Sequence, residues 1–211
     1  MGRGYDGYCP VAHALGVVGE RWSLLVVREL QHGPLRYTDL HARLPGCSTN
    51  ILAARLKELE SGGVIAREKL PPPAPATVYA LTPSGEALQP VLRELAWWAI
   101  GRLGPPPADT VFDDEELTHV LQTAVPPDAA REPLEVHVGA ATAHVGPAGA
   151  QPGAAEDPVA TITADPCSLY ALLVDRAIDR VDIHGDESAV AELLAALPHA
   201  GAVPAVESLS P

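Results

Sequence analysis

The stretch Leu44–Ile65, "LPGCSTNILAARLKELESGGVI", determines how the first half of the chain folds. Its "PGC" segment predicts a turn, and Ser48 is a favourable N-cap because its hydroxyl can accept a backbone N–H of the first helical turn. The pair Gly62-Gly63 is suited to close the helix with a left-handed C-cap. Apolar side chains at helical spacing predict one buried face, made of Leu52, Leu56 and Leu59.

The segments around this stretch complete a recognisable order of elements. Gly33-Pro34 ends the helix before it, and Thr82-Pro83 starts the helix after it, which Pro90 should kink or break. The order is helix, helix, turn, helix, hairpin, helix, which predicts a winged helix-turn-helix. The segments are "ERWSLLVVRELQHG" (20–33), "YTDLHARL" (37–44), "VIAREKL" (64–70), the proline-rich tip "PPPAPA" (71–76) and "TVYALT" (77–82).

A winged helix presents one helix to the major groove of DNA and a hairpin to the flanking backbone. On the presented helix Asn50 can pair bidentately with adenine, whereas Ala53 and Ala54 can offer only methyl contacts, for example to thymine. Few side chains on this helix can therefore read bases directly, and phosphate contacts or DNA shape should contribute more of the specificity. The predicted DNA-binding residues are Arg36, Thr38, Ser48, Thr49, Asn50, Ala53, Arg55, Lys57, Arg67 and Lys69.

Charge divides the chain into two unlike parts. The net charge is −13 over 211 residues, but residues 1–104 carry a net charge of +2 and residues 105–211 a net charge of −15. Only the first part could approach a phosphate backbone without strong repulsion. The run Pro105-Pro106-Pro107 lies at the transition and favours an extended spacer. We expect a DNA-binding domain over 1–104, a linker over 105–110 and a second domain over 111–211.

Composition narrows the class of protein further. No apolar run is long enough for a membrane helix and no signal peptide is evident, so we expect a cytoplasmic protein that associates with the nucleoid while bound to DNA. The cysteines Cys9, Cys47 and Cys167 are widely spaced and odd in number, which fits a reducing compartment. Neither they nor the histidines have a metal-ligand spacing, and we expect no metal and no cofactor. No Ser-His-Asp or phosphate-loop pattern occurs, so an enzyme is not expected.

The second half predicts a compact α+β domain. Asp113, Asp165 and Asp186 each precede an amphipathic helix and are good N-caps. The strands alternate apolar and polar residues, whereas "GPAGAQPGAA" (146–155) is interpreted as a loop or as compositional bias. The predicted strands are "LEVHVG" (134–139), "TAHVG" (142–146), "VATITA" (159–164) and "VDIHG" (181–185).

Over most of residues 9–103 the chain resembles the HxlR-type winged-helix transcriptional regulators. The resemblance rests on the Cys9-Pro10 start, "ERWSLLVVREL", "HGPLRYTDL", "RLKELESGGVI" and "YALTPSG" taken together. It implies homodimers, built through the terminal helices, that bind pseudo-palindromic operators. Here the dimer surface would include the first helices and the helix Pro83–Leu103, with Trp97 and Trp98 more suited to that interface than to stacking on a ligand. The named dimer residues are Val91, Leu92, Leu95 and Trp98.

Within the second half, residues 158–197 resemble a sterol carrier protein type 2-like domain, in the order strand, capped helix, strand ending in Gly185-Asp186, final helix. Such domains enclose apolar ligands between helices and sheet. The resemblance implies a ligand pocket lined by Leu117, Val120, Leu121, Leu169, Leu172 and Leu173.

Several functions stay open on these grounds. The first is a dimeric transcriptional regulator modulated by an apolar small molecule in the second domain. In the second, that domain only enlarges the dimer or contacts another protein. A third is thiol-based redox sensing, because Cys9 matches the cysteine of family members that sense oxidants or electrophiles; a buried or idle thiol is the favoured alternative. An enzyme or lipid carrier tethered to a DNA-binding module lacks any catalytic pattern.

Overall fold

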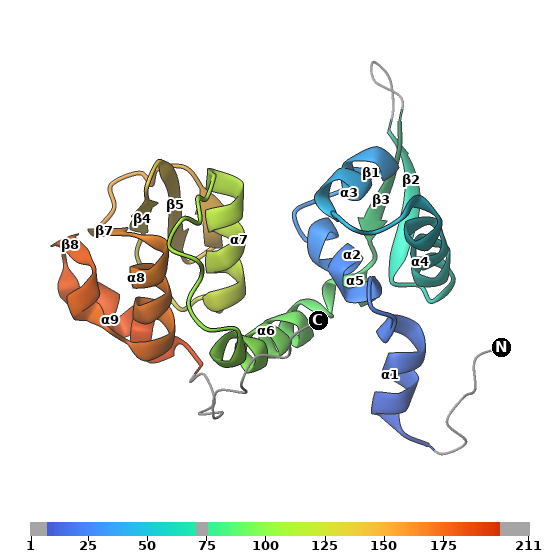
Figure 1. Cartoon of the computed structure of the whole chain (residues 1–211), viewed down its shortest axis with the longest axis horizontal. Coiled ribbons are helices and arrows are strands. Elements are labelled where there is room, and N and C mark those ends of the chain that lie inside the picture. Colours follow the sequence, from blue (N-terminus) through green and yellow to red (C-terminus); the bar gives the residue numbers. More distant parts are fainter. Residues whose placement is uncertain (1–7, 71–75, 199–211) are drawn as a thin grey trace. The chain divides into compact units, whose positions relative to one another are not determined.

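The structure, a computed structural model, describes residues 8–70 and 76–198. Most of the proline-rich tip, 71–75, lies outside the described residues, as do the chain ends 1–7 and 199–211 that the expected domains included. The chain divides into two compact units, Met1–Leu92 and Arg93–Pro211, and each is described by itself (Figure 1).

The first unit confirms the winged helix-turn-helix order. Its hairpin strands pair in antiparallel fashion, and a very short strand directly before α3 joins them in the order β1-β3-β2, which the sequence had not indicated. The elements are α1 (Pro10–Val18), α2 (Ser23–Leu30), β1 (Leu35–Arg36), α3 (Tyr37–Arg43), α4 (Thr49–Ser61), β2 (Ile65–Leu70), β3 (Ala76–Leu81), α5 (Pro83–Glu86) and the start of α6 (Gln89–Leu103).

Helix α4 is bounded as its sequence predicts. The Ser48 hydroxyl accepts the backbone N–H of Ile51 at 3.4 Å. At the other end Gly63 takes a left-handed conformation with φ of 70°, and the N–H of Val64 donates to the carbonyl of Leu59 at 2.9 Å. These bonds satisfy groups that the helix ends leave without partners. The predicted inner face is confirmed, since Leu52, Leu56 and Leu59 are buried in the core of the unit.

Pro90 interrupts the last predicted helix of the first half, as expected. The segment splits into α5, which Thr82 caps, and α6, in which Pro90 occupies the first turn. A proline is tolerated there because the backbone N–H groups of a first turn have no partner within the helix.

The second unit is an α+β domain built on a five-stranded mixed sheet in the order β6-β5-β4-β7-β8. Strands β4 and β7 run parallel, and the other neighbours are antiparallel. The elements are α7 (Asp114–Ala124), β4 (Leu134–Val138), β5 (Ala141–Gly146), β6 (Gly149–Pro152), β7 (Ala160–Ala164), α8 (Pro166–Tyr170), a π-helical turn (Ala171–Asp175), a 3-10 turn (Ile178–Arg180), β8 (Asp182–Gly185) and α9 (Glu187–Ala196).

Strand β6 corrects the sequence interpretation of residues 146–155 as a loop. Gly149, with φ of 89°, closes a tight turn after β5, and Ala150 then pairs with Val145 and is buried. The strand is at the edge of the sheet, where a proline at its end removes no interior hydrogen bond. A glycine- and proline-rich edge strand has too little apolar alternation to be recognised from its sequence.

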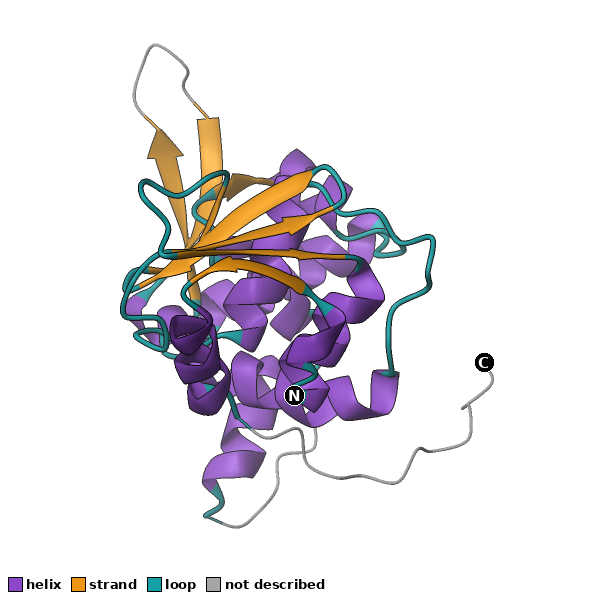
Figure 2. Cartoon of the chain, turned by 90° about the vertical axis from the view of Figure 1, so that its left-hand side faces the viewer, coloured by secondary structure: helices purple, strands orange, loops and turns teal. Residues whose placement is uncertain are grey.

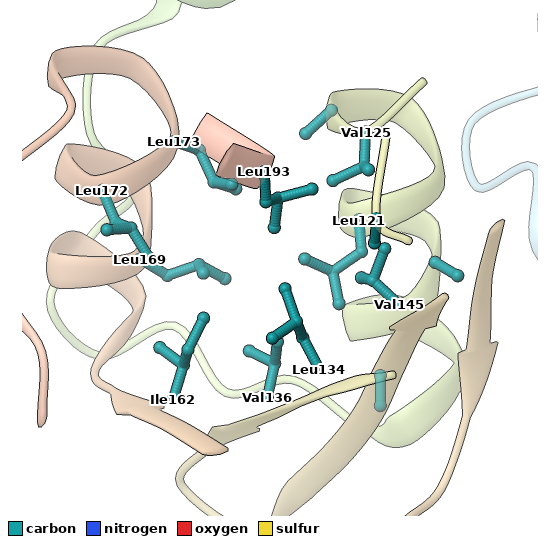
Figure 3. Packing of buried hydrophobic residues seen from close by; sticks show 14 of the residues in the cluster. Leu121, Val125, Leu134, Val136, Val145, Ile162, Leu169, Leu172, Leu173 and Leu193 are labelled. Atoms are coloured by element: carbon teal, nitrogen blue, oxygen red, sulfur yellow. The ribbon is translucent and has the colours of Figure 1, made fainter. Parts of the chain in front are cut away.

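The helices of the second unit gather on one side of its sheet (Figure 2). The three predicted aspartate caps are confirmed, and Asp113 forms a full capping box with Glu116. Side chains of α7 and of the segment from Leu169 to Leu173 point toward one another over the apolar face of the sheet (Figure 3). The residues predicted to line a ligand pocket all belong to this packed cluster: Leu117, Leu121, Leu169, Leu172 and Leu173 are buried, and Val120 is partly buried.

The two compact units divide between Leu92 and Arg93, inside α6. Trp97, expected in a dimer interface, is instead 4% exposed in the core of the second unit, so that expectation is wrong. Its indole N–H donates to the carbonyl of Ala124 at 3.2 Å, and the hydroxyl of Tyr170 donates to the carbonyl of Ile100 at 3.3 Å. The linker proposed at 105–110 stays a prediction.

Candidate nucleic-acid interface

The exposed face of α4 lies opposite its leucine face. Helical geometry separates the two, because residues three, four and seven apart share a side. The exposed residues include four of the predicted DNA-binding set: Thr49, Asn50, Ala53 and Lys57. Ala54, between them, is half-buried. The structure therefore brings these predicted residues together on one accessible surface.

The start of α4 is held by a contact that the sequence did not reveal. The hydroxyl of Tyr37 at the start of α3 donates to the backbone carbonyl of Thr49 at 2.8 Å. The Tyr37 ring also stacks on His41, with the ring centroids 6.4 Å apart. Ser48, whose hydroxyl caps α4, is exposed in the same turn. The hydrogen bond from Tyr37 thus holds the N-terminal end of the presented helix against α3.

Ile51 is a further exposed residue of α4 that sequence reasoning missed. Its side chain is 42% exposed beside Asn50, although isoleucine normally lies in a core. An apolar side chain near the N-terminal end of a DNA-reading helix can contact the methyl group of thymine. Its place outside the leucine repeat was the available sequence signal.

Arg55 is placed differently from the other predicted contacts. Its side chain is only 17% exposed, and its Nη1 lies 3.1 Å from Oε2 of Glu20 and 2.8 Å from Oε2 of Glu58. Its positive charge also opposes the effect of burial on Cys47, whose pKa burial raises. Cys47 is buried in the turn before α4 and belongs to the core of the first unit. The DNA contact predicted for Arg55 would require it to leave both carboxylates.

The hairpin carries the remaining basic residues. Arg67 lies over the ring of Tyr79, 5.2 Å from its centroid, and 3.7 Å from Glu60. Lys69 is exposed toward the end of β2. The tyrosine therefore holds Arg67 on the strand, while Lys69 extends beyond it along the same edge of the wing.

Arg36 and Thr38 lie at the entrance to α3. Both are exposed, Arg36 occupies the N-cap position of α3, and the Thr38 hydroxyl donates to Oδ1 of Asp39 at 3.2 Å. The hydroxyl is thus already engaged, while the arginine stays available at the surface.

Other kinds of site have less support. Within residues 8–70 and 76–198, no group of three or more His, Cys, Asp and Glu side chains could hold a metal ion. Among the described helices, none combines the length and hydropathy that a membrane crossing requires. Cys9 is half-buried at the N-cap of α1, and its predicted redox role stays a prediction.

A helix core that presents one exposed helix beside a basic antiparallel hairpin defines a winged helix-turn-helix DNA-binding protein. The profile of the HxlR-like helix-turn-helix family matches residues 17–105. The HTH-type transcriptional regulator YodB of Bacillus subtilis is 37% identical over 109 residues, which cover 51% of this chain and 96% of YodB. The chain belongs to the HxlR-like family of helix-turn-helix transcriptional regulators, and this is a family of DNA-binding proteins and not of enzymes.

Two further relatives match the same part of the chain. An HTH-type transcriptional regulator of Synechocystis is 44% identical over 84 residues, which cover 40% of this chain but only 62% of that protein. The regulator YvaP of Bacillus subtilis is 38% identical over 98 residues, covering 46% of this chain and 91% of YvaP. The solved structure of reduced YodB covers 44% of this chain and 92% of its own, with 37% identity and a TM-score of 0.40.

The family match ends where the acidic part of the chain begins. Residues 17–105 account for the winged helix and for α6, whereas the mixed sheet and its helices follow them. The likeness of residues 158–197 to a sterol carrier protein therefore rests on their sequence pattern alone.

Proposed function

We propose that the protein acts as a homodimer that binds a pseudo-palindromic operator in double-stranded DNA, with α4 in the major groove and the β2–β3 hairpin on the flanking backbone. The observation that carries the proposal is the exposed face of α4, which lies opposite a buried leucine face and beside the basic hairpin. A chain with a net charge of −13 concentrates its cations in this part, where phosphate groups would meet them.

Each predicted contact then has a distinct role. Asn50 supplies the bidentate contact to adenine, and Ile51 and Ala53 supply apolar contacts to thymine methyl groups. Arg36, Lys57, Arg67 and Lys69 lie around these base-reading groups and contact phosphates, which fixes the register of the protein on the duplex. Ser48 and Thr49 add hydrogen bonds at the entrance to the groove, and Thr38 joins them when its hydroxyl leaves Asp39.

The proposed dimer forms through α1 and α6. On α6 three large apolar residues at positions i, i+4 and i+7 are exposed, and on α1 Val11 and Leu15 are exposed. A second copy of the chain would bury these faces, which individually soluble proteins seldom leave open. Leu92, also predicted in the interface, already packs against the core of the first unit. These three α6 residues are Val91, Leu95 and Trp98, and Leu103 at the end of the helix is exposed as well.

Selection of genomic fragments by the purified protein tests DNA binding directly. We expect retention of a defined set of fragments, including one from upstream of the protein's own gene, at moderate salt. Lys69→Ala should weaken retention and lower the salt dependence of binding, because one phosphate contact is lost. Failure of the wild-type protein to retain any fragment at low salt would refute the proposed function.

For the second unit we propose binding of an apolar small molecule that shifts the DNA-binding equilibrium. The support is the resemblance of residues 158–197 to domains that enclose apolar ligands; the residues that this resemblance assigns to the pocket pack together in the core of the unit. The alternative is a unit that only enlarges the dimer or contacts another protein. Native mass spectrometry separates them, since a bound ligand adds mass that solvent extraction removes, whereas an unliganded mass in repeated preparations favours the alternative.

A thiol response remains a further proposal, resting on the half-buried position of Cys9 at the start of α1, one of the proposed dimer helices. Oxidant treatment should then change operator binding by the wild-type protein and leave Cys9→Ser unaffected. Equal responses of the two proteins would remove Cys9 from the mechanism.

A further inference from the structure

Arg55 is the one predicted DNA-contacting residue whose side chain turns away from solvent. It has 17% of its side chain exposed, while its neighbours on the other side of α4, Asn50, Ala53 and Lys57, are exposed. Its guanidinium lies between Glu20 and Glu58, 3.1 Å from the first and 2.8 Å from the second. The cation is thus already neutralised from two sides.

Two carboxylates around one guanidinium leave this corner of the domain with a net negative charge. A phosphate group approaching it would be repelled by Glu20 and Glu58, unless Arg55 left both of them. Lys57, by contrast, is exposed and forms no ion pair within the described residues. Electrostatics therefore favours Lys57 as the phosphate contact of α4 and gives Arg55 another role.

The partner Glu20 identifies that role. Glu20 lies in the connection between α1 and α2, so its ion pair joins the presented helix to the end of α1. Helices α4 and α1 also approach closely at Gly62. A Cβ placed on this glycine would come within 2.8 Å of Cγ1 of Val17 on α1. The side of α4 that carries Arg55 and its C-terminal end are thus both held against the α1 region.

We propose that Arg55 is a positioning residue, whose ion pair with Glu20 sets the angle of α4 relative to α1. The inference rests on the proposed function, because α1 carries part of the proposed dimer surface. In a dimer that reads two half-sites, the angle between dimer helix and reading helix determines the half-site spacing that fits. Loss of the ion pair should therefore broaden the range of spacings that the protein accepts.

The substitution Glu20→Gln distinguishes this role from direct DNA contact by the sign of its effect. If Arg55 contacted phosphate, removing an acidic competitor would free it and tighten binding. If Arg55 positions α4 through Glu20, the same substitution weakens binding. Glu58→Gln is the matched control, because it removes the other carboxylate beside the same guanidinium but leaves the link to α1 intact.

The experiment measures binding of the full-length protein to the operator recovered by genomic selection, and to versions with the half-site spacing changed by one base pair in either direction. For Glu20→Gln and Arg55→Met we expect similar losses on the best operator, roughly fivefold, and a flatter dependence on spacing. The double variant should lose no more than either single one, and all should keep the wild-type salt slope. Lys57→Met should lower that slope by about one.

The inference is overturned if Arg55→Met lowers the salt slope while Glu20→Gln tightens binding or leaves it unchanged. Additive losses in the double variant would also overturn it. These outcomes differ from failure of the proposed function, in which the wild type itself binds no DNA. In that case the melting temperatures of the same variants test the ion pair by itself. A positioning ion pair predicts that Arg55→Met and Glu20→Gln lower the melting temperature equally and non-additively.

Discussion

Helices α4 and α6 both bury one face and expose the other, but the exposed faces differ in chemistry. Apart from Ile51, the exposed surface of α4 carries small or polar side chains, among them Thr49, Asn50, Ala53 and Lys57. The face of α6 carries large apolar side chains: Val91, Leu95 and Trp98. A hydrated, charged groove favours the first surface and a second protein favours the other, so the difference supports DNA as the partner of α4 and a second chain as the partner of α6.

The contrast is sharpest between two adjacent residues of α6. Trp97 is 4% exposed and Trp98 is 59% exposed, because consecutive helical residues point in different directions. Trp97 lies under the guanidinium of Arg176, which is 5.9 Å from the ring centroid, while Arg102 covers Trp98 at 4.6 Å. The same helix thus belongs to the core of the second unit on one side and is available for dimerisation on the other.

The largest effect is expected for Trp97→Ala. This change removes a buried indole and its hydrogen bond to Ala124, and should lower the free energy of unfolding of the second unit by about 3 to 5 kcal/mol. Chemical denaturation followed by circular dichroism measures the change. A loss below about 1 kcal/mol, typical of surface substitutions, would contradict the placement of Trp97 in the core.

Trp98→Ala is the matched substitution on the exposed face. The free energy of unfolding of the monomer should change little, whereas dimer association should weaken by about 2 kcal/mol, the loss typical of a central interface aromatic. Analytical ultracentrifugation over a concentration series gives the dissociation constant. A wild-type protein that stays monomeric at high concentration would remove α6 from the proposed interface.

The residues that were predictable from sequence are those whose role depends on near neighbours. Ser48, Gly63 and Pro90 act within a turn of their own positions, and the leucine repeat of α4 needs only helical spacing. The role of Arg55 could not be predicted from the sequence. Its partner Glu20 lies in the connection between α1 and α2 and becomes a neighbour only on folding.

The second unit shows the same limit. Trp97 and Trp98 read alike in the sequence, and only the packing of α6 against Ala124, Tyr170 and Arg176 separates them. Arg176 itself takes a left-handed conformation, with φ of 60°, and donates to the carbonyls of Leu197 and Pro198. A lone arginine in an apolar segment gives no sequence indication that it closes helix ends.

Asn50→Ala tests the base-reading role of the small face of α4. The lost bidentate contact should cost about 1 to 3 kcal/mol on the selected operator, with little change on unrelated duplexes. Competition binding at one fixed salt concentration measures both. Equal losses on operator and unrelated DNA would show that Asn50 contacts the backbone rather than a base.

The smallest effect is expected for Glu135, which lies on β4 in the second unit. It belongs to neither the proposed DNA-binding surface nor the proposed dimer surface. Its Oε2 accepts the backbone N–H of Ala155 at 2.8 Å and its Oε1 lies 2.7 Å from Nε2 of His137. The bond from Ala155 is the main reason that the pKa of the carboxyl is lowered, with His137 adding to it. The stabilisation is therefore present above the ordinary glutamate pKa of about 4.3 and is lost as pH falls through the lower pKa of the folded state.

Glu135→Gln should remove this part of the acid dependence. We expect a loss of about 1 kcal/mol near neutral pH, one charge-assisted hydrogen bond being weakened, and a loss that shrinks as pH falls below 4. Unfolding curves at several pH values, compared between variant and wild type, isolate Glu135 from Asp165 and Asp186, whose pKa values are also lowered, mainly by neighbouring serine hydroxyls. If the difference in free energy of unfolding between the two proteins stays constant from neutral to acid pH, the charge of the Glu135 carboxylate does not contribute to stability.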